Sequence, residues 1–135
     1  MIFLDSSFII ALSVVNDENH EKARRIMKKI ARGKFGQAYI SDYVFNEVVT
    51  VILVKTKNVK KAANVGELLL KSVRIVYTDK SLFDKTWRNF VAQKGTMFSF
   101  TDCNITSVME NTGIKYLATF DKEFMKIPWI IVVKD

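Results

Sequence analysis

The sequence contains very little cysteine, histidine or proline, and each shortage excludes a class of protein or site. Cys103 is the only cysteine among 135 residues, so the chain can form neither an intramolecular disulfide nor a multi-cysteine zinc site. His20 is the only histidine, which excludes any mechanism that needs two imidazoles. The single proline, Pro128, stands just before a predicted final strand and interrupts no regular element. Packing of ordinary side chains must therefore stabilise the fold.

Long apolar runs are also missing. No stretch approaches the roughly 18 to 20 residues that a membrane-spanning helix needs. The first residues, MIFLD, have neither a basic region before the apolar run nor a small-residue cleavage site. We therefore expect a cytoplasmic protein with no membrane partner. With 49% hydrophobic and 26% charged residues, the chain has the composition and length of a single globular domain, residues 1–135.

Acidic residues are fewer than basic ones. The chain has 14 Asp and Glu against 21 Lys and Arg, a formal net charge of +7 and a pI near 9.5. Positive charge of this size favours a polyanionic partner such as nucleic acid. Two basic segments, residues 24–29 and 55–61, could contact phosphates, although basic helix faces are more often simply solvated.

Strand-like and helix-like patterns alternate along the chain. Short apolar runs predict strands at residues 1–4, 39–40, 73–77, 114–118 and 129–133. Helical spacing predicts helices at residues 8–12, 23–31, 44–52, 59–71, 82–91 and 102–111. We expect Ser41, either Thr78 or Asp79, and Thr101 to cap three of these helices and Gly113 to end the last one. The alternation predicts an α/β fold of three layers, α/β/α, with a mostly parallel central sheet.

Acidic residues stand where several predicted strands end. Asp5 directly follows the first apolar run, before Ser6 and Ser7, which can cap the first helix. Glu47 lies in the first turns of the helix after the second strand, and Asp121 follows the fourth strand. Because parallel α/β sheets bind ligands beyond the carboxyl ends of their strands, these three acids should meet at one edge.

Asp102 joins this group if its helix begins at the same edge, which makes four carboxylates. The carboxylates of such a cluster repel one another unless protons or cations neutralise them. Carboxylate oxygens are hard ligands that suit Mg²⁺ or Mn²⁺, and an ion held in this way can activate water beside a phosphate. A basic surface around an acidic, metal-binding centre suits nucleic-acid hydrolysis.

Each acid also has a purely structural interpretation. Asp5 could be a turn residue at a strand end, and Asp102 and Asp121 could stabilise the start of a helix or turn. Glu47 has valines one helical turn away on either side, so it lies on or beside an apolar face, where an unpaired carboxylate is costly. Asp42 is better explained as a first-turn residue that the helix dipole favours.

The ordered set of motifs resembles the PIN-domain ribonucleases, most closely the single-domain VapC-type toxins of toxin-antitoxin pairs. The stretch FLDSSFIIAL resembles the family's opening strand with its metal-binding Asp and the Ser or Thr after it, here Asp5 and Ser6. The stretch SDYVFNEVV resembles the segment that carries the family's Glu, here Glu47. Each motif alone is weak, but the ordered set is specific.

The most diagnostic block of the resemblance is FSFTDCNITSVMENTGIKYLATFDKEF. It places the family's helical Asp at Asp102 and its T-x-D-x-x-F element at Thr119, Asp121 and Phe124. One departure is the pair Cys103-Asn104, because the family commonly has a small residue after its Asp. This departure indicates different packing rather than different chemistry.

The resemblance implies a doubly wound, Rossmann-like sheet and endonuclease activity on RNA. In such an enzyme the four acids are both the catalytic residues and the ligands of Mg²⁺ or Mn²⁺, and Ser6 and Thr119 are supporting polar groups. The resemblance also implies a homodimer and a small antitoxin protein whose tail reaches the active site.

Other functions stay open at this point. A PIN-like RNA-processing nuclease outside toxin-antitoxin pairs would use the same acids. A catalytically silent RNA- or protein-binding module is disfavoured, because a binder of polyanions gains nothing from clustered negative charge. Aspartyl-phosphate phosphatases also carry an acid after their first strand, but usually with a second Asp two positions on, where this chain has Ser7. No G-x-G-x-x-G or phosphate-loop motif supports a nucleotide-binding oxidoreductase.

Overall fold

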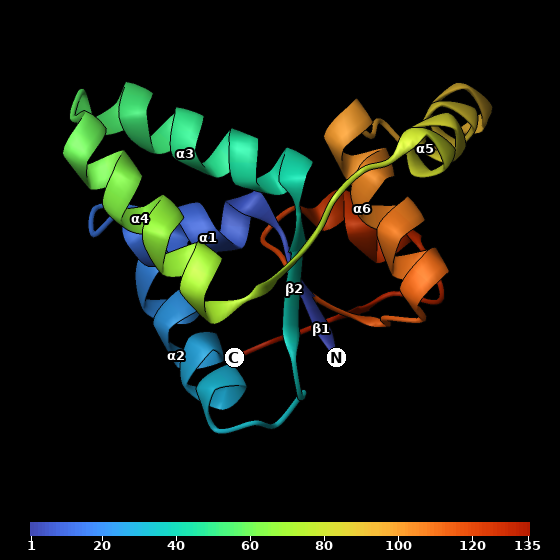
Figure 1. Cartoon of the computed structure of the whole chain (residues 1–135). Coiled ribbons are helices and arrows are strands. Elements are labelled where there is room, and N and C mark those ends of the chain that lie inside the picture. Colours follow the sequence, from blue (N-terminus) through green and yellow to red (C-terminus); the bar gives the residue numbers. More distant parts are fainter.

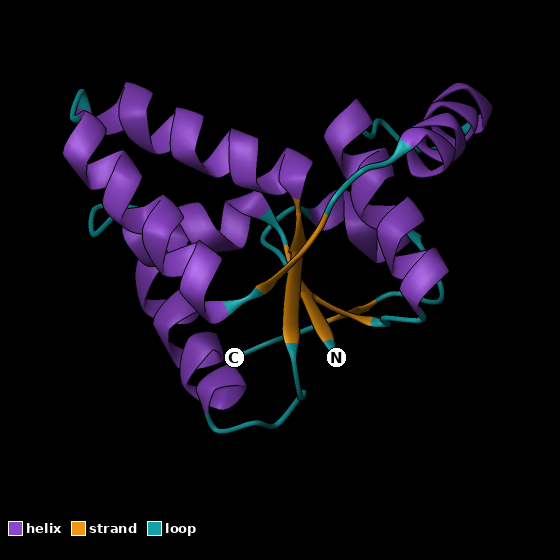
Figure 2. Ribbon diagram, in the orientation of Figure 1, coloured by secondary structure: helices purple, strands orange, loops and turns teal.

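The centre of the fold is a five-stranded sheet. The computed structural model describes residues 1–135, and its strands are β1 (Ile2–Leu4), β2 (Ala38–Ser41), β3 (Arg74–Val76), β4 (Tyr116–Ala118) and β5 (Ile131–Val132). They lie in the order β3-β2-β1-β4-β5, and every neighbouring pair is parallel. Figure 2 shows these strands between two groups of helices, so the predicted α/β class is confirmed.

Helices cover both faces of the sheet. They are α1 (Ser6–Ser13), α2 (His20–Ala31), α3 (Asp42–Thr56), α4 (Val59–Ser72), α5 (Lys80–Ala92), α6 (Phe100–Thr112) and the 3₁₀ helix η1 (Lys122–Lys126). Figure 1 shows α1 to α4 on one side of the strands and α5 and α6 on the other, which gives the three predicted layers. α3 packs on α1 and α4, and α5 packs on α6. None of these helices is long and apolar enough to span a membrane.

The strand that precedes Asp5 is held by the core. The three residues of β1 are at most 3% exposed, because β1 is the central strand and has helices on both faces. They belong to one cluster of 28 buried apolar residues. Burying a side chain as large as Phe3 contributes about 1.5–3 kcal/mol, so β1 is a firm base for the acid that follows it.

One helix begins earlier than its sequence pattern suggested. α6 starts at Phe100, and its N-cap is Ser99 rather than Thr101. The Ser99 hydroxyl accepts a hydrogen bond from the Asp102 N–H, and the Asp102 carboxylate accepts one from the Ser99 N–H. This is a capping box, with Asp in the place where Glu or Gln is usual. The reciprocal pair gives two backbone N–H groups a hydrogen-bond acceptor at once, which a cap at Thr101 would not do.

Three other predicted helix ends, at Ser41, Asp79 and Gly113, agree with the structure, whereas some strands are shorter. Ser41 and Asp79 each accept a backbone N–H at the start of their helices. Gly113 ends α6 with φ of +74°, a conformation that other residues rarely adopt. β4 and β5 pair over three and two residues, fewer than their apolar runs predicted.

The strand order reverses between β1 and β4. The chain runs from β1 outward to β2 and β3, and then returns to the other side of β1 for β4 and β5. Open α/β sheets bind their ligands at such a reversal, beyond the carboxyl ends of the strands. The Asp5 N–H donates to the Ala118 carbonyl at 3.0 Å and ties the two strand ends together. Acids that follow β1 and β4 therefore lie at the expected ligand-binding point.

Candidate active site

Asp5 is the only acidic residue in the buried interior. It is 3% exposed and occupies the N-cap position of α1, where Ser6 or Ser7 had been expected. An N-cap Asp normally accepts an N–H of its own helix, but the Asp5 side chain makes no such bond. Its Oδ2 instead accepts hydrogen bonds from the hydroxyls of Ser7 and Thr119, both at 2.7 Å. The Asp5 side chain therefore does not cap α1, although the residue stands at the N-cap position.

Ser7 is a site residue that the motifs did not single out. Besides its bond to Asp5, its hydroxyl accepts the Phe120 N–H at 3.0 Å and lies 3.2 Å from the Thr119 hydroxyl. It thus joins the start of α1 to the loop after β4. Its position, two residues after Asp5, was a usable signal, because a side chain there returns to the same carboxylate. In an aspartyl-phosphate enzyme a second Asp would stand at this position, whereas in this chain the Ser7 hydroxyl positions the Asp5 carboxylate.

Glu47 reaches the same place from α3. Its Oε1 accepts a hydrogen bond from the Ser6 hydroxyl, and the same hydroxyl lies 3.3 Å from Asp5 Oδ1. Ser6 therefore contacts both carboxylates. Glu47 is half-buried on α3, between the buried Val44 and Val48, as its flanking valines had indicated.

Asp102 and Asp121 each use one oxygen for local structure. Asp102 Oδ2 accepts the Ser99 N–H at 3.0 Å in the capping box, and Asp121 Oδ1 accepts the Glu123 N–H at 2.9 Å where η1 begins. The structural interpretation is correct for these two oxygens. The other oxygen of each carboxylate accepts no hydrogen bond from the protein.

Electrostatic repulsion links the four acids into one group. Burial raises the pKa of Asp5, and the charge of Glu47 adds to this effect against the hydrogen bonds that Asp5 accepts. Burial, together with the charges of Asp5 and Asp121, raises the pKa of Asp102 to about 6. None of the five ion pairs in the protein includes any of these acids. Within a chain of net charge +7, none of these four carboxylates therefore forms an ion pair with a basic side chain.

The chemistry of this donor set fits a hard divalent cation. Glu47, Asp102 and Asp121 each keep one oxygen free of hydrogen bonds, and Asp5 Oδ1 has only the long contact with Ser6. Mg²⁺ and Mn²⁺ prefer such oxygen ligands. However, no three acidic, histidine or cysteine side chains stand close enough together to hold a metal ion. A shared ion would have to draw the free oxygens inward by side-chain rotation, so a shared ion stays a prediction.

Two polar residues near these elements have other roles, in agreement with the sequence patterns. His20 is the first residue of α2, and its Nδ1 lies 2.9 Å from the Ala11 carbonyl oxygen. Asp42 accepts hydrogen bonds from the N–H and the hydroxyl of Thr78. Thr78 in turn accepts one from Asn104, whose buried Oδ1 has no hydrogen-bond partner. The unusual Asn104 therefore belongs to the packing between α6 and the start of α3, as its departure from the family pattern suggested.

Nearly the whole chain matches one known family. The model of the PIN domain matches residues 2–130. The chain belongs to the PIN-domain family. A curated relative of this PIN domain is the 23S rRNA-specific endonuclease VapC20 of Mycobacterium tuberculosis. The two are 27% identical over 124 residues, which cover 92% of each chain.

Solved structures resemble this PIN domain over its full length. The crystal structure of M. tuberculosis VapC20, described as a sarcin-ricin loop cleaving toxin, has a TM-score of 0.89 at 25% identity and covers 100% of both chains. DNA-bound VapBC from Salmonella typhimurium has a TM-score of 0.73 at 20% identity, covering 98% of this chain and 96% of the other. VapBC2 from Rickettsia felis, bound to a promoter DNA fragment, has a TM-score of 0.72 at 18% identity, and the match covers 98% of both chains. These last two establish the fold alone.

Proposed function

We propose that this PIN domain is a metal-dependent endoribonuclease that hydrolyses RNA phosphodiester bonds as the toxin of a toxin-antitoxin pair. The observation that carries the proposal is the group of four acids at the reversal point of the sheet, none of which forms an ion pair with a lysine or arginine. Such charge opposes the binding of RNA unless a cation lies between them. The similarity to a 23S rRNA-specific endonuclease supports RNA as the substrate.

The chain's own residues have separable tasks in this mechanism. The four acids offer oxygen ligands, and the hydroxyls of Ser7 and Thr119 hold the Asp5 carboxylate in one orientation. A bound Mg²⁺ or Mn²⁺ ion supplies Lewis-acid stabilisation of the phosphate and activates the attacking water. Imidazole has no part in proton transfer, because the only histidine, His20, contacts the backbone of α1 instead.

Metal removal is the direct test of this function. We expect the protein to cleave an rRNA fragment that contains the sarcin-ricin loop when Mg²⁺ or Mn²⁺ is present. EDTA should lower the rate at least about 100-fold, because several kcal/mol of transition-state stabilisation depend on the ion. Excess Mg²⁺ should restore the rate, which denaturing gels measure. RNA that is retained but uncut under every metal condition would favour the silent binding module.

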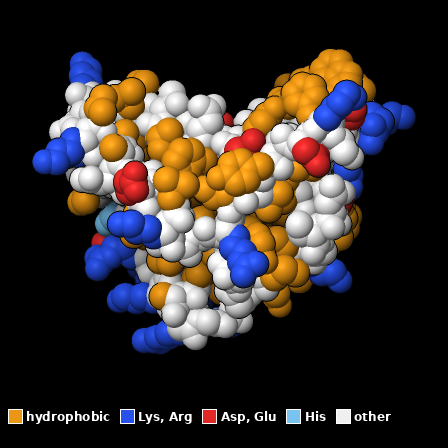
Figure 3. All heavy atoms as spheres, viewed as in Figure 1, with side chains coloured by type: hydrophobic (Ala, Val, Ile, Leu, Met, Phe, Trp, Pro, Cys, Tyr) orange, Lys and Arg blue, Asp and Glu red, His pale blue; other side chains and the backbone are white.

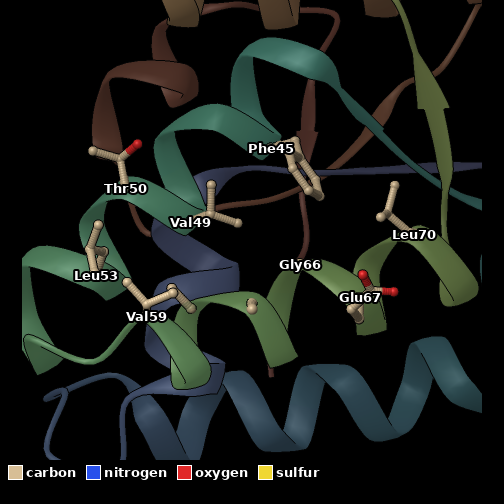
Figure 4. Close-up of a pocket in the computed structure, with 10 residues that line it drawn as sticks. Phe45, Val49, Thr50, Leu53, Val59, Gly66, Glu67 and Leu70 are labelled. Carbon is tan, nitrogen blue, oxygen red and sulfur yellow. The ribbon is translucent and has the colours of Figure 1, made fainter.

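An apolar groove between α3 and α4 offers a docking surface for an antitoxin. It encloses about 330 Å³, and Figure 4 shows Phe45 and Val49 of α3 near Gly66 of α4, with Leu53 beside Val59. A Cβ atom on Gly66 would lie 3.2 Å from Val49 and 3.3 Å from Phe45, so the two helices approach closely there. Exposed lysines flank the lining residues in sequence, at positions 55, 57, 60, 61 and 71. An amphipathic segment with acidic residues beside its apolar ones would match both features.

Adjacent residues of α3 provide a matched test of this docking surface. Leu53 lines the groove, whereas the next residue, Val54, is 68% exposed and does not. We expect Leu53→Glu to weaken binding of the proposed antitoxin at least about tenfold, because it would bury an unpaired carboxylate. Val54→Glu should bind as the wild type does, as calorimetric titration can measure. Equal affinities for the two variants would exclude the groove as the docking site.

A second exposed apolar surface lies on α5. Phe83, Trp87 and Val91 are 46%, 53% and 60% exposed, and Figure 3 shows hydrophobic side chains gathered over this helix. The rings of Phe83 and Phe90 pack around Phe100 and make the patch continuous with α6. Apolar patches of this kind mark interaction sites. A second copy of the chain is the occupant that the predicted homodimer requires.

A further inference from the structure

A cavity of about 220 Å³ adjoins the acidic site on the side of β5. Its walls come from α2, from the loop between β4 and η1, and from the residues that follow β5. Thr119 and Asp121 form part of the wall, and the Thr119 hydroxyl is the one that donates to Asp5. The cavity and the acidic site therefore share residues. A ligand in the cavity would lie beside whatever the acids hold.

Three lysines from distant parts of the sequence line this cavity. They are Lys22 of α2, Lys122 of η1 and Lys134 just after β5. None of them takes part in an ion pair, and all three are exposed to solvent. Their ammonium groups are therefore available to an incoming anion.

The acids of the cavity do not cancel this positive charge. Asp135 is already paired with Arg25 at 2.7 Å. The hydrogen bond from Arg25 is the main reason why the pKa of Asp135 lies below its usual range, and the charge of Lys22 contributes. Asp121, the other acid in the wall, belongs to the group that a cation would neutralise. Lys29 adds positive charge outside the cavity, where its Nζ donates to the Lys134 carbonyl at 3.1 Å.

Apolar side chains complete the cavity. Phe120, Met125 and Ile26 lie in its wall, and Met125 is 58% exposed. Pockets that enclose a whole small molecule measure about 300–1,000 Å³. At about 220 Å³ this cavity is smaller, so it suits one sugar-phosphate unit of a polymer, with the phosphate toward the lysines and the sugar on the apolar wall.

We infer that this cavity is a subsite for the RNA backbone, in which Lys22, Lys122 and Lys134 bind the phosphate next to the one that is cleaved. The inference rests on the proposed nuclease function and adds the path of the strand, from the acids past the end of β4 to the end of β5. Lysine binds phosphate as a point charge without a fixed geometry, which suits a strand that must move on after cleavage.

A charge-matched pair of variants tests the subsite. The first combines Lys22→Ala, Lys122→Ala and Lys134→Ala. The control combines Lys71→Ala, Lys94→Ala and Lys115→Ala, which removes three exposed lysines that have no ion pair and lie outside the cavity. Both variants lose three positive charges, so they weaken any non-specific attraction for RNA equally. Circular dichroism and thermal unfolding would verify that each is folded.

The readout is RNA affinity and its dependence on salt. Fluorescence anisotropy with labelled sarcin-ricin loop RNA, in Mg²⁺ and with Asp5→Asn added to every protein, measures binding with little cleavage. We expect the dissociation constant of the cavity variant to be at least about tenfold above that of the control, from the loss of one well-held phosphate. The slope of log affinity against log salt should fall by about 0.7–0.9, the value for one phosphate, rather than by three times that amount. With Mg²⁺ present and Asp5 intact, KM should rise by a larger factor than kcat falls.

The possible outcomes separate the subsite from the nuclease function. If RNA binding depends on the cavity lysines but no cleavage occurs, the subsite is supported and the nuclease proposal fails. If cleavage occurs and the two triple variants bind RNA equally, the subsite is overturned and the nuclease function stands. A wild-type protein that neither binds nor cleaves this RNA or other ribosomal RNA fragments would overturn both.

Discussion

Replacing Asp5 by Asn is expected to lower the rate of RNA cleavage at least about 100-fold while the protein stays folded. The amide oxygen can still accept the hydroxyls of Ser7 and Thr119, and a neutral side chain is easier to bury than a carboxylate. What is lost is one negative ligand of the cation, on which several kcal/mol of transition-state stabilisation depend. Initial cleavage rates in Mg²⁺ measure the effect.

Asp42→Asn is the matched control for this experiment. Asp42 is also a first-turn acid that follows a strand, but its Oδ1 accepts hydrogen bonds from Thr78 and its side chain is not part of the acidic group. The variant keeps an acceptor for Thr78, so its cleavage rate should stay within about threefold of the wild type, as for most substitutions outside special sites. Cleavage by Asp5→Asn at the rate of Asp42→Asn would show that the proposed site is wrong.

Replacing Asp102 by Asn is expected to abolish cleavage and yet stabilise the metal-free protein at alkaline pH. The folded state raises the pKa of Asp102 from 3.8 to about 6, so it binds the proton more tightly than the unfolded state does. Ionisation of Asp102 therefore lowers the free energy of unfolding by its full amount above about pH 6. The loss becomes smaller as the pH falls from 6 toward 3.8. Asn carries no penalty at any pH, and it still accepts the Ser99 N–H of the capping box.

The size of this stabilisation can be bounded. A rise from 3.8 to about 6 corresponds to about 3 kcal/mol at about 1.4 kcal/mol per pH unit. Because Asp102 is only half-buried, solvent screening reduces the expected gain in unfolding free energy to about 1 kcal/mol. Urea denaturation in EDTA at pH 8, 6 and 5 should show the gain shrinking as the pH falls.

Added Mg²⁺ should reverse the order of stability. An ion that binds only the folded protein raises its free energy of unfolding by RT ln(1 + [L]/Kd). Mg²⁺ should therefore raise the free energy of unfolding of the wild type more than that of Asp102→Asn. Glu18→Gln is the control, because Glu18 is exposed and has no ion pair. Its stability should match the wild type within about 0.5 kcal/mol under every condition. An Asp102→Asn protein that is less stable than the wild type at pH 8 would contradict the raised pKa.

The fold could be predicted because its signals are local. Apolar runs and helical spacing depend on neighbours in the sequence, so all five strands, the six α-helices and the caps at Ser41 and Asp79 followed from short windows. The error at the start of α6 was also local. Ser99 competes with Thr101, and Ser99 caps because its hydroxyl lies three residues before Asp102 and completes the reciprocal pair. Strand lengths were overestimated because pairing, which the apolar runs do not contain, decides where β4 and β5 end.

The four acids of the proposed site were predicted from the sequence motifs, together with Ser6 and Thr119 as supporting polar groups, but Ser7 was not singled out. Ser7 lies only two positions from Asp5, but its contact with Thr119 bridges 112 positions of sequence and exists only because β1 and β4 are neighbours. The role of Asp102 was ambiguous for a similar reason. One of its oxygens serves the local cap, and only the packing of α6 against the sheet determines that Asp5 and Asp121 raise its pKa.

The sequence by itself determined the family and the order of strands and helices along the chain, and it predicted the four acids of the proposed site, because each of these signals lies in a short stretch of neighbouring residues. The tertiary structure alone decided which oxygens are free, which hydroxyls hold Asp5, and that Lys22, Lys122 and Lys134 surround one cavity. The physical reason is that hydrogen bonds and Coulomb interactions act over a few ångströms in space. Residues a hundred positions apart meet at that range only after β1, β4 and β5 have paired.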